Sequence, residues 1–254
     1  MHFIHRLLML RARSSGLRFV LGASAAAAIA FAGLGHPGVF AQEAHVVPPP
    51  VLDEPKLAGA APQSETIVLA GGCFWGVQGV FQHVKGVTEA VSGYTGGDRT
   101  TATYETVNTG TTGHAESVRV TFDPQQISLG HILQIYFSVA HNPTELDRQG
   151  PDVGTEYRST IFPTTPAQAR AARAYIAQLD NAHVFAAPIV TTVENGRTFY
   201  PAEAYHQNYV TLHPDEPYVA INEVPKLVGL KRLFPTEYRD RSVLVKPEAK
   251  AASS

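Results

Sequence analysis

The chain has 254 residues, of which 44% are hydrophobic and 17% charged, so it is typical of a globular protein with one large or two small domains. The formal net charge of −2 excludes a strongly basic nucleic-acid-binding protein. The single cysteine, Cys73, excludes an intrachain disulfide framework and cysteine-rich zinc or iron–sulfur sites.

Residues 1–41 have the pattern of a secretory signal peptide. Four arginines precede a run of apolar and small residues from Phe19 to about Leu34, and Val39-Phe-Ala41 resembles a cleavage site. We therefore expect an exported, periplasmic protein, or a membrane-anchored one if the leader is not cleaved. The run is short for the ~20 residues of a bilayer span.

Cleavage after Ala41 would leave an acidic protein. It removes four arginines and no acid, which changes the net charge from −2 to about −6. We therefore expect no binding to nucleic acid or to anionic lipid.

Three regions follow the leader. Residues 42–65 contain five prolines and no apolar periodicity, which predicts an extended linker. Residues 66–240 have the size of one domain, and residues 241–254 predict a disordered tail.

The domain begins with a predicted strand at 66–70, a helix at 74–83 and a strand at 87–94, which together indicate a βαβ unit. Further predicted elements are strands at 117–122, 157–162 and 188–193, a helix from Ser128 to about 140 capped by that serine, a helix opened by Thr165-Pro166 that ends near 180, and a loop at 140–156. The fold class is α/β.

Cys73 falls at the turn between the first strand and the first helix. The N–H groups at a helix start favour the thiolate, so we expect a lowered pKa for this thiol. Phe74 and Trp75 lie beside it and predict an apolar pocket for a small group. The alternative is a small buried hydrophobic residue among core aromatics.

Gly72-Cys-Phe-Trp-Gly76 resembles the signature of the A-type methionine sulfoxide reductases, the peptide-methionine (S)-S-oxide reductase family. Further blocks from about Thr66 to Tyr238 agree in order: 92–97, 104–107, 110–116, 148–152, 154–159, and 199–203 with 205–207. The resemblance implies a two-layer α/β (α+β) domain with a mixed sheet, flanking helices and a ferredoxin-like core. It also implies thiol-dependent reduction of methionine (S)-S-oxide, in proteins and as the free amino acid, and thereby repair of oxidised proteins.

The resemblance also implies roles for individual residues. Cys73 is the nucleophile that attacks the sulfoxide sulfur and becomes a sulfenic acid. Glu116 is the acid, whose pKa burial must raise. The remaining implied site residues are Tyr104 and Tyr157 on the sulfoxide oxygen, Asp152 in the same pocket, Phe74 and Trp75 around the substrate methyl, and Gly72, His114 and His206 as a supporting shell.

Relatives often carry further cysteines near the C-terminus, and this chain has none. We therefore expect no bound cofactor and recycling by an external thiol, either a thioredoxin-like or glutaredoxin-like partner or a small thiol. The chain also departs from relatives at Gln78, Asn142, Pro151, Ala204 and Asn208. None of these positions is the nucleophile, the acid or one of the two tyrosines, so we expect the departures to affect the fine adjustment of the site rather than the reaction itself.

Two other functions stay open at this point. One is a Cys-His acyl transferase or hydrolase with His114 or His206 as base. The other is a sulfoxide-binding or thiol-sensing protein without turnover. We expect no metal site, because no pair of candidate ligands has a recognisable spacing. We expect the protein to be a monomer whose partners are oxidised proteins, free methionine sulfoxide and a thiol reductant.

Overall fold

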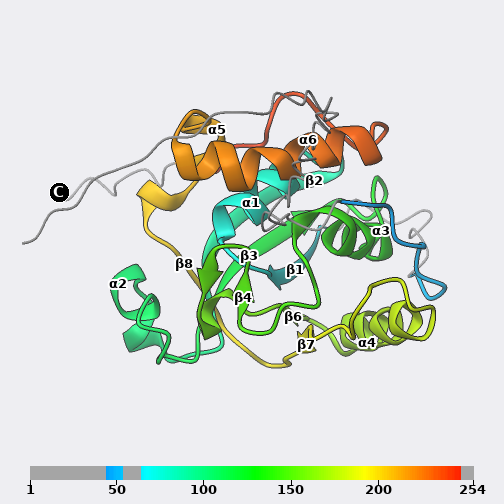
Figure 1. Cartoon of the computed structure of the whole chain (residues 1–254), viewed down its shortest axis with the longest axis horizontal. Coiled ribbons are helices and arrows are strands. Elements are labelled where there is room, and N and C mark those ends of the chain that lie inside the picture. The colour runs from blue at the N-terminus through cyan, green and yellow to red at the C-terminus, as the bar shows by residue number, and fades with distance from the viewer. Residues whose placement is uncertain (1–43, 54–63, 247–254) are drawn as a thin grey trace, which may run out of the picture. The chain divides into compact units, whose positions relative to one another are not determined.

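The structure is a computed structural model that describes residues 44–53 and 64–246 (Figure 1). The predicted signal peptide, residues 1–41, lies outside the described residues, as do residues 54–63 of the predicted linker and 247–254 of the predicted tail. No helix of the described ranges is long and apolar enough to cross a membrane.

A six-stranded sheet lies at the centre of the described domain (Figure 1). The strands lie in the order β7-β6-β1-β3-β2-β8, in which β6 and β7 pair in parallel and the other neighbours pair antiparallel. The strands are β1 (Glu65–Ala70), β2 (Val87–Thr95), β3 (Ala115–Phe122), β6 (Thr160–Phe162), β7 (Thr192–Val193) and β8 (Phe199–Pro201).

Helix α1 (Phe74–Gln82) connects β1 to β2, as the predicted βαβ unit requires. β3 pairs antiparallel with both strands, so β1 and β2 run parallel without being neighbours. β6 pairs with the other edge of β1, which gives the order β6-β1-β3-β2 of a ferredoxin-like core. The predicted fold class is confirmed.

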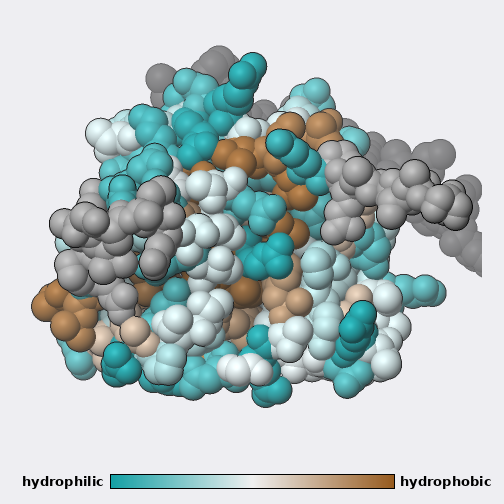
Figure 2. Space-filling view, turned by 180° about the vertical axis from the view of Figure 1, so that it is seen from behind, coloured by the Kyte–Doolittle hydropathy of each residue, from teal (hydrophilic) through white to brown (hydrophobic). Residues whose placement is uncertain are grey.

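Alternation along the strands separates the two faces of the sheet. Ile67 and Leu69 of β1 lie in a large hydrophobic core, whereas Val68 and Ala70 join a small cluster on the opposite face. Side chains of α1, α3, α4 and α6 complete the large core, so these helices cover one face. Seen from behind the view of Figure 1, the surface is mostly hydrophilic and its hydrophobic residues form separate patches (Figure 2).

The other helices are α2 (Tyr104–Val107), α3 (Leu129–Ile135), α4 (Pro166–Asn181), α5 (Tyr209–Leu212) and α6 (Val224–Leu233). A π-helical turn, Tyr136–Ala140, continues α3, and another, Val219–Glu223, precedes α6. Ser128 and Thr165 cap α3 and α4, as predicted, because each hydroxyl accepts a backbone N–H three residues later.

Three predicted elements differ from the structure. The strand predicted at 157–162 begins only at Thr160, because Tyr157 ends a 3-10 turn. The strand predicted at 188–193 is confined to β7, since the N–H of Val190 donates to the carbonyl of Pro143 outside the sheet. The predicted loop at 140–156 contains a short hairpin, β4 (Arg148–Gln149) and β5 (Asp152–Val153).

Residues 44–53, predicted as part of the linker, are packed on α3 and α4. They form neither helix nor strand, but Val47 is fully buried. The side-chain amide of Gln134 donates to the carbonyl of Val47 at 2.8 Å, and the Tyr175 hydroxyl donates to that of Pro48 at 2.7 Å. Buried donors on the two helices thus use the backbone acceptors of the segment. Residues 44–53 of the predicted extended linker are therefore packed against the domain.

Residues 241–246, predicted as part of the tail, are also held on the domain. The N–H of Val243 donates to the carbonyl of Gln82 at 3.0 Å. The Asn208 amide accepts from the N–H of Val245 at 2.9 Å and donates to its carbonyl at 3.0 Å. These pairs order the chain beyond α6, so the prediction of disorder is wrong here.

Val47→Ala tests the packing of the proline-rich segment. We expect it to lower the free energy of unfolding by about 1–3 kcal/mol, because it leaves a cavity beside α3 and α4. Val51 is 82% exposed in the same segment, so Val51→Ala should change stability by less than about 0.5 kcal/mol. Urea denaturation measures both. Equal effects of the two variants would contradict the packed arrangement.

Candidate active site

Cys73 lies between β1 and α1, at the N-cap position of the helix, and is 8% exposed. The preceding Gly72 has φ +85°, which favours glycine. A Cβ at Gly72 would also lie 2.5 Å from Cγ of Gln149. The backbone conformation and this close approach therefore both require glycine beside the thiol.

Gln149 holds the β4–β5 hairpin against this turn. Its amide oxygen accepts from the N–H of Asn142 at 2.9 Å, and its amide nitrogen donates to the Asn142 carbonyl at 3.0 Å. These two hydrogen bonds close the loop that starts at Asn142. The Gln149 side chain also packs against Gly72. Asp152, in the second strand of this hairpin, is brought to the site by the same contact.

Glu116 is 4% exposed and projects from β3 toward the start of α1. Its Oε2 accepts the N–H of Phe74 at 3.0 Å, so the carboxyl group lies directly beside the Cys73 turn. Burial raises the pKa of Glu116 to about 8, and the charges of Asp152, Glu156 and Glu223 add to the rise against the lowering by the Phe74 hydrogen bond. The carboxyl group is therefore protonated at neutral pH.

The expected lowering of the Cys73 pKa is not found. Burial raises the pKa of the thiol well above its ordinary value, and the negative charges of Glu116, once it is ionised above about pH 8, and of Glu223 raise it further. The N–H of Trp75 and the ammonium group of Lys226 oppose the rise. The helix start does favour the thiolate, but desolvation is the larger effect, so the prediction from position alone was wrong.

The structure brings the phenols of Tyr104 and Tyr157 to the same place. Tyr104 opens α2 and Tyr157 ends the 3-10 turn Thr155–Tyr157. Burial raises the pKa of both phenols, and the charges of Glu116 and Cys73 raise it further. Both hydroxyls are therefore neutral hydrogen-bond donors close to the carboxyl group and the thiol.

Asp152 is half-buried, and its Oδ2 accepts a short hydrogen bond from the hydroxyl of Tyr218. Burial raises its pKa, while the Tyr218 hydrogen bond and the charge of Lys226 act in the opposite direction. Asp152 thus lies near enough to Glu116 for its charge to act on that carboxyl group, and its direct partner is a tyrosine that the sequence analysis did not identify.

Trp75 forms one wall of an aromatic cluster. Its indole stacks on Tyr209 with ring centroids 3.7 Å apart, and it meets Tyr218 edge-on at 6.0 Å. Its Nε1–H donates to Nδ1 of His206 at 3.1 Å. Phe74 is almost fully buried behind it and packs against His206 at 5.0 Å. Trp75 is the half-buried member of the predicted pair, and Phe74 belongs to the core.

Neither histidine is arranged as a base for Cys73. His114 accepts the N–H of Gly97 and donates to the carbonyl of Asp98, so both ring nitrogens hold the glycine turn. Nδ1 of His206 accepts from Trp75, and burial lowers the pKa of this histidine. The arrangement supports the predicted shell position of both residues and disfavours a Cys-His pair.

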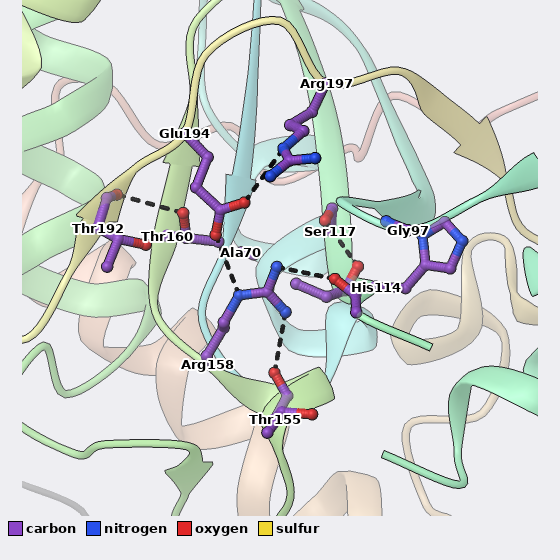
Figure 3. Close-up of polar contacts among 12 residues, drawn as sticks. Ala70, Gly97, His114, Ser117, Thr155, Arg158, Thr160, Thr192, Glu194 and Arg197 are labelled. Atoms are coloured by element: carbon purple, nitrogen blue, oxygen red, sulfur yellow. Dashed lines mark hydrogen bonds and ion pairs between the residues drawn. The ribbon is translucent and has the colours of Figure 1, made fainter. Parts of the chain in front are cut away.

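Arg158 ties together the loops that carry the site residues (Figure 3). Its guanidinium group donates to the carbonyls of Thr155 and Gly113, each at 3.1 Å, and pairs with Glu194 at 3.2 Å. Thr155 begins the turn that holds Tyr157, and Gly113 precedes the strand that holds Glu116. Because one side chain joins both backbone segments, the Tyr157 phenol and the Glu116 carboxyl group keep a fixed position relative to each other.

Sequence reasoning missed a buried ion pair beside the thiol. Glu223 is 1% exposed, and its Oε2 lies 2.7 Å from Nζ of Lys226. An acid and a lysine three residues apart in a helix are usually a solvated surface pair, so the sequence offered no signal for burial. Tyr218 was missed because it lies outside the motif blocks, and Gln149, although it lies within block 148–152, was missed because an amide side chain has no obvious chemical task.

The structure explains two departures from relatives. The Gln78 amide donates to Gln207 at 2.8 Å and accepts from the N–H of Asn208 at 2.8 Å. An ionised glutamate could accept from Asn208 but could not donate to Gln207. Asn208 has φ +62°, a conformation that asparagine tolerates, and its amide pairs with Val245. Nothing in the structure explains Ala204, which is exposed.

No group of three or more His, Cys, Asp or Glu side chains in residues 44–53 and 64–246 is arranged to hold a metal ion.

Residues 65–237 match the model of the family described as Peptide methionine sulfoxide reductase. The protein named Peptide methionine sulfoxide reductase MsrA 2 of Mesorhizobium japonicum is 62% identical over 186 residues, which cover 73% of this chain and 95% of that protein. A protein of the same name from Synechocystis sp. is 46% identical over 77% of this chain and 90% of its own length. The crystal structure of reduced Mxr1 from Saccharomyces cerevisiae matches with a TM-score of 0.55 and 30% identity, over 61% of this chain and 88% of that one.

Glu116→Gln tests the buried acid. The folded chain keeps a proton on Glu116 up to about pH 8, whereas the ordinary pKa of such a group is 4.5. Between these values the folded state binds more protons than the unfolded state, so its stability falls as pH rises. We expect Glu116→Gln, which has no such titration, to be more stable than the original chain by about 2–5 kcal/mol at pH 8.5 and equal within about 1 kcal/mol at pH 4.5.

Urea denaturation at the two pH values measures this difference. The matched control is Glu105→Gln, on an exposed position of α2, which should show no pH-dependent gain. A gain for Glu116→Gln that is the same at pH 4.5 and 8.5 would show that the carboxyl group does not hold its proton in the folded chain.

Proposed function

The chain belongs to the peptide methionine sulfoxide reductase A family, and we propose that Cys73 is the residue at which its reaction takes place. The protein is an enzyme that reduces methionine (S)-S-oxide to methionine with a thiol as the reductant. The observation that supports the proposed site is the contact between the Phe74 N–H and Glu116, which places a protonated carboxyl group beside the single thiol of the chain.

In the proposed mechanism, the thiolate of Cys73 attacks the sulfoxide sulfur while Glu116 gives its proton to the sulfoxide oxygen. The S–O bond of the sulfoxide then breaks as the oxygen is transferred to Sγ of Cys73, and the Sγ–S bond formed in the attack breaks, so that methionine leaves and Cys73 is a sulfenic acid. The proton lost from the thiol restores Glu116, so one thiol and one sulfoxide give one sulfenic acid and one methionine. The hydroxyls of Tyr104 and Tyr157 donate to the oxygen as its negative charge develops.

Asp152 and the aromatic cluster orient the substrate in this proposal. The Asp152–Tyr218 hydrogen bond fixes a polar wall of the site, and Trp75 supplies the apolar wall against which the substrate methyl packs. Phe74 supports Trp75 from the core. The hydrogen bond between Trp75 and His206 keeps the indole in one orientation, so the methyl group meets a rigid surface.

Recycling requires thiols from outside the chain, because Cys73 is its only cysteine. A first external thiol condenses with the sulfenic acid, which releases water and forms a mixed disulfide. A second thiol then releases Cys73 and leaves an oxidised disulfide. We infer that a thioredoxin-like or glutaredoxin-like protein or a small thiol supplies these electrons, and that the chain acts as a monomer.

A single turnover without reductant tests the proposed site. We expect about one methionine per chain from the S epimer of methionine sulfoxide and none from the R epimer, with a sulfenic-acid reagent labelling Cys73 in step. Cys73→Ser should give no methionine. Addition of dithiothreitol should convert the single turnover into continuous reduction.

The other two functions make different products in the same assay. An acyl transferase would leave both epimers intact and form a thioester with an acyl donor. A sensor would give oxidised Cys73 without methionine. No methionine from either epimer would refute the proposed mechanism, and continuous turnover without added thiol would refute the recycling scheme.

We also propose that the protein is exported to the periplasm, on the basis of the basic and apolar pattern of residues 1–41. A fusion of these residues to alkaline phosphatase, expressed in a Gram-negative host, should be active and should lose the leader. Replacement of the four leader arginines by glutamate should keep the fusion in the cytoplasm. An inactive fusion with the original leader would contradict export.

A further inference from the structure

The buried ion pair of Glu223 and Lys226 comes from the segment that follows the predicted motif blocks. Glu223 ends the π-helical turn Val219–Glu223, and Lys226 lies in the first turn of α6. Their side chains meet at 2.7 Å, with 1% of the glutamate and 18% of the lysine side chain exposed. Burial of two opposite charges costs desolvation energy, which an ordinary surface pair does not have to overcome.

This pair lies directly against the start of helix α1. A Cβ on Gly76 would lie 1.6 Å from Oε2 of Glu223 and 2.8 Å from Nζ of Lys226. Gly76 is in the first turn of α1, three residues after Cys73. The glycine therefore leaves the space in which both charges reach the turn that carries the thiol.

The groups around Cys73 carry mostly negative or neutral charge. Glu116 faces it from β3, Glu223 and Lys226 from the π-helical turn and α6, and the phenols of Tyr104, Tyr157 and Tyr218 from α2, the 3-10 turn and the segment before Val219. Asp152, from β5, acts on the same phenols and on Lys226.

Two histidines complete the surroundings, and neither supplies a positive charge. His141 faces Lys226 and has its pKa lowered to about 3, mainly by burial. Burial also lowers the pKa of His206. Among the groups named here, Lys226 therefore carries the positive charge.

We propose that Lys226 is a positioning residue for the reaction, whose buried ammonium group neutralises Glu223 under helix α1 and favours the thiolate of Cys73. The proposal rests on the proposed role of Cys73 as nucleophile. Without Lys226, the negative charge of Glu223 would not be neutralised. It would then disfavour the second negative charge, the thiolate of Cys73, that must form at the same turn. Glu223 in turn holds the flexible lysine chain in one place, so the two residues have opposite effects on the thiol.

The signs of these effects follow from the charges. Lys226 opposes the raised pKa of Cys73, and Glu223 contributes to it. Loss of the glutamate charge should therefore make the thiol ionise at lower pH, and loss of the lysine charge should make it ionise at higher pH. If the two residues only packed against α1, their substitution would not shift the ionisation of the Cys73 thiol in opposite directions.

The pH dependence of Cys73 alkylation by iodoacetamide tests the proposal in the full chain, where the single cysteine makes the signal specific. The decisive comparison is Glu223→Gln against the double variant Glu223→Gln with Lys226→Met, because residue 223 is uncharged in both. We expect the double variant to have an alkylation midpoint about 1 pH unit higher and an about tenfold lower rate below that midpoint. Equal midpoints would overturn the proposal.

Two further variants keep the test decisive if Glu223→Gln does not fold. Lys226→Arg retains the charge and should keep the original midpoint, whereas Lys226→Met should raise it, and equal midpoints here would also overturn the proposal. Lys231→Met is the matched control, since Lys231 lies on the same helix with 62% of its side chain exposed and pairs with Asp240 at the surface. Its midpoint should be that of the original chain.

The outcome is independent of the proposed mechanism. Alkylation needs no sulfoxide, so a failed single turnover with an intact difference between the Lys226 variants would refute the mechanism alone. Successful single turnover with no difference between them would refute the role of Lys226 alone.

Discussion

The hydrogen bond from the Phe74 N–H to Glu116 joins the two halves of the active site. It connects the start of α1, which carries the thiol, to β3, the central strand between β1 and β2. Because the carboxyl group is sealed between helix and sheet, it keeps its proton at neutral pH. The split βαβ arrangement makes this contact available, since only a strand inserted between β1 and β2 passes under the helix start.

The other site residues come from loops that are secured by single polar side chains. Gln149 closes the loop that brings Asp152, and Arg158 joins the segments of Tyr157 and Glu116. Gln78 performs a similar task for the segment of His206, because its amide holds Gln207 and Asn208. The sheet thus positions Glu116, and single polar side chains position Tyr157 and Asp152 around it.

Much of this arrangement could be predicted from the sequence, and the exceptions have physical causes. The βαβ unit and the caps at Ser128 and Thr165 followed from periodicity and local motifs, whereas the site residues around Cys73 were implied by the family resemblance. The raised pKa of Cys73 followed from neither, because it depends on burial and on the charges of Glu116 and Glu223, which are distant in sequence. The packing of Val47 and the burial of Lys226 were also hidden, since a proline-rich segment and a helical charge pair look the same whether or not another element covers them.

The two hydrogen bonds between the Gln149 side chain and the Asn142 backbone secure the loop without using its exposed side chains. They use one side chain and two backbone groups, so the exposed positions of the same loop, such as Leu146 and Val153, do not hold the thiol in place. Side chains at these exposed positions can therefore change without loss of the hydrogen bonds that secure the loop beside the nucleophile. The hairpin thus combines residues that maintain the site, Gln149 and Asp152, with exposed positions that do not.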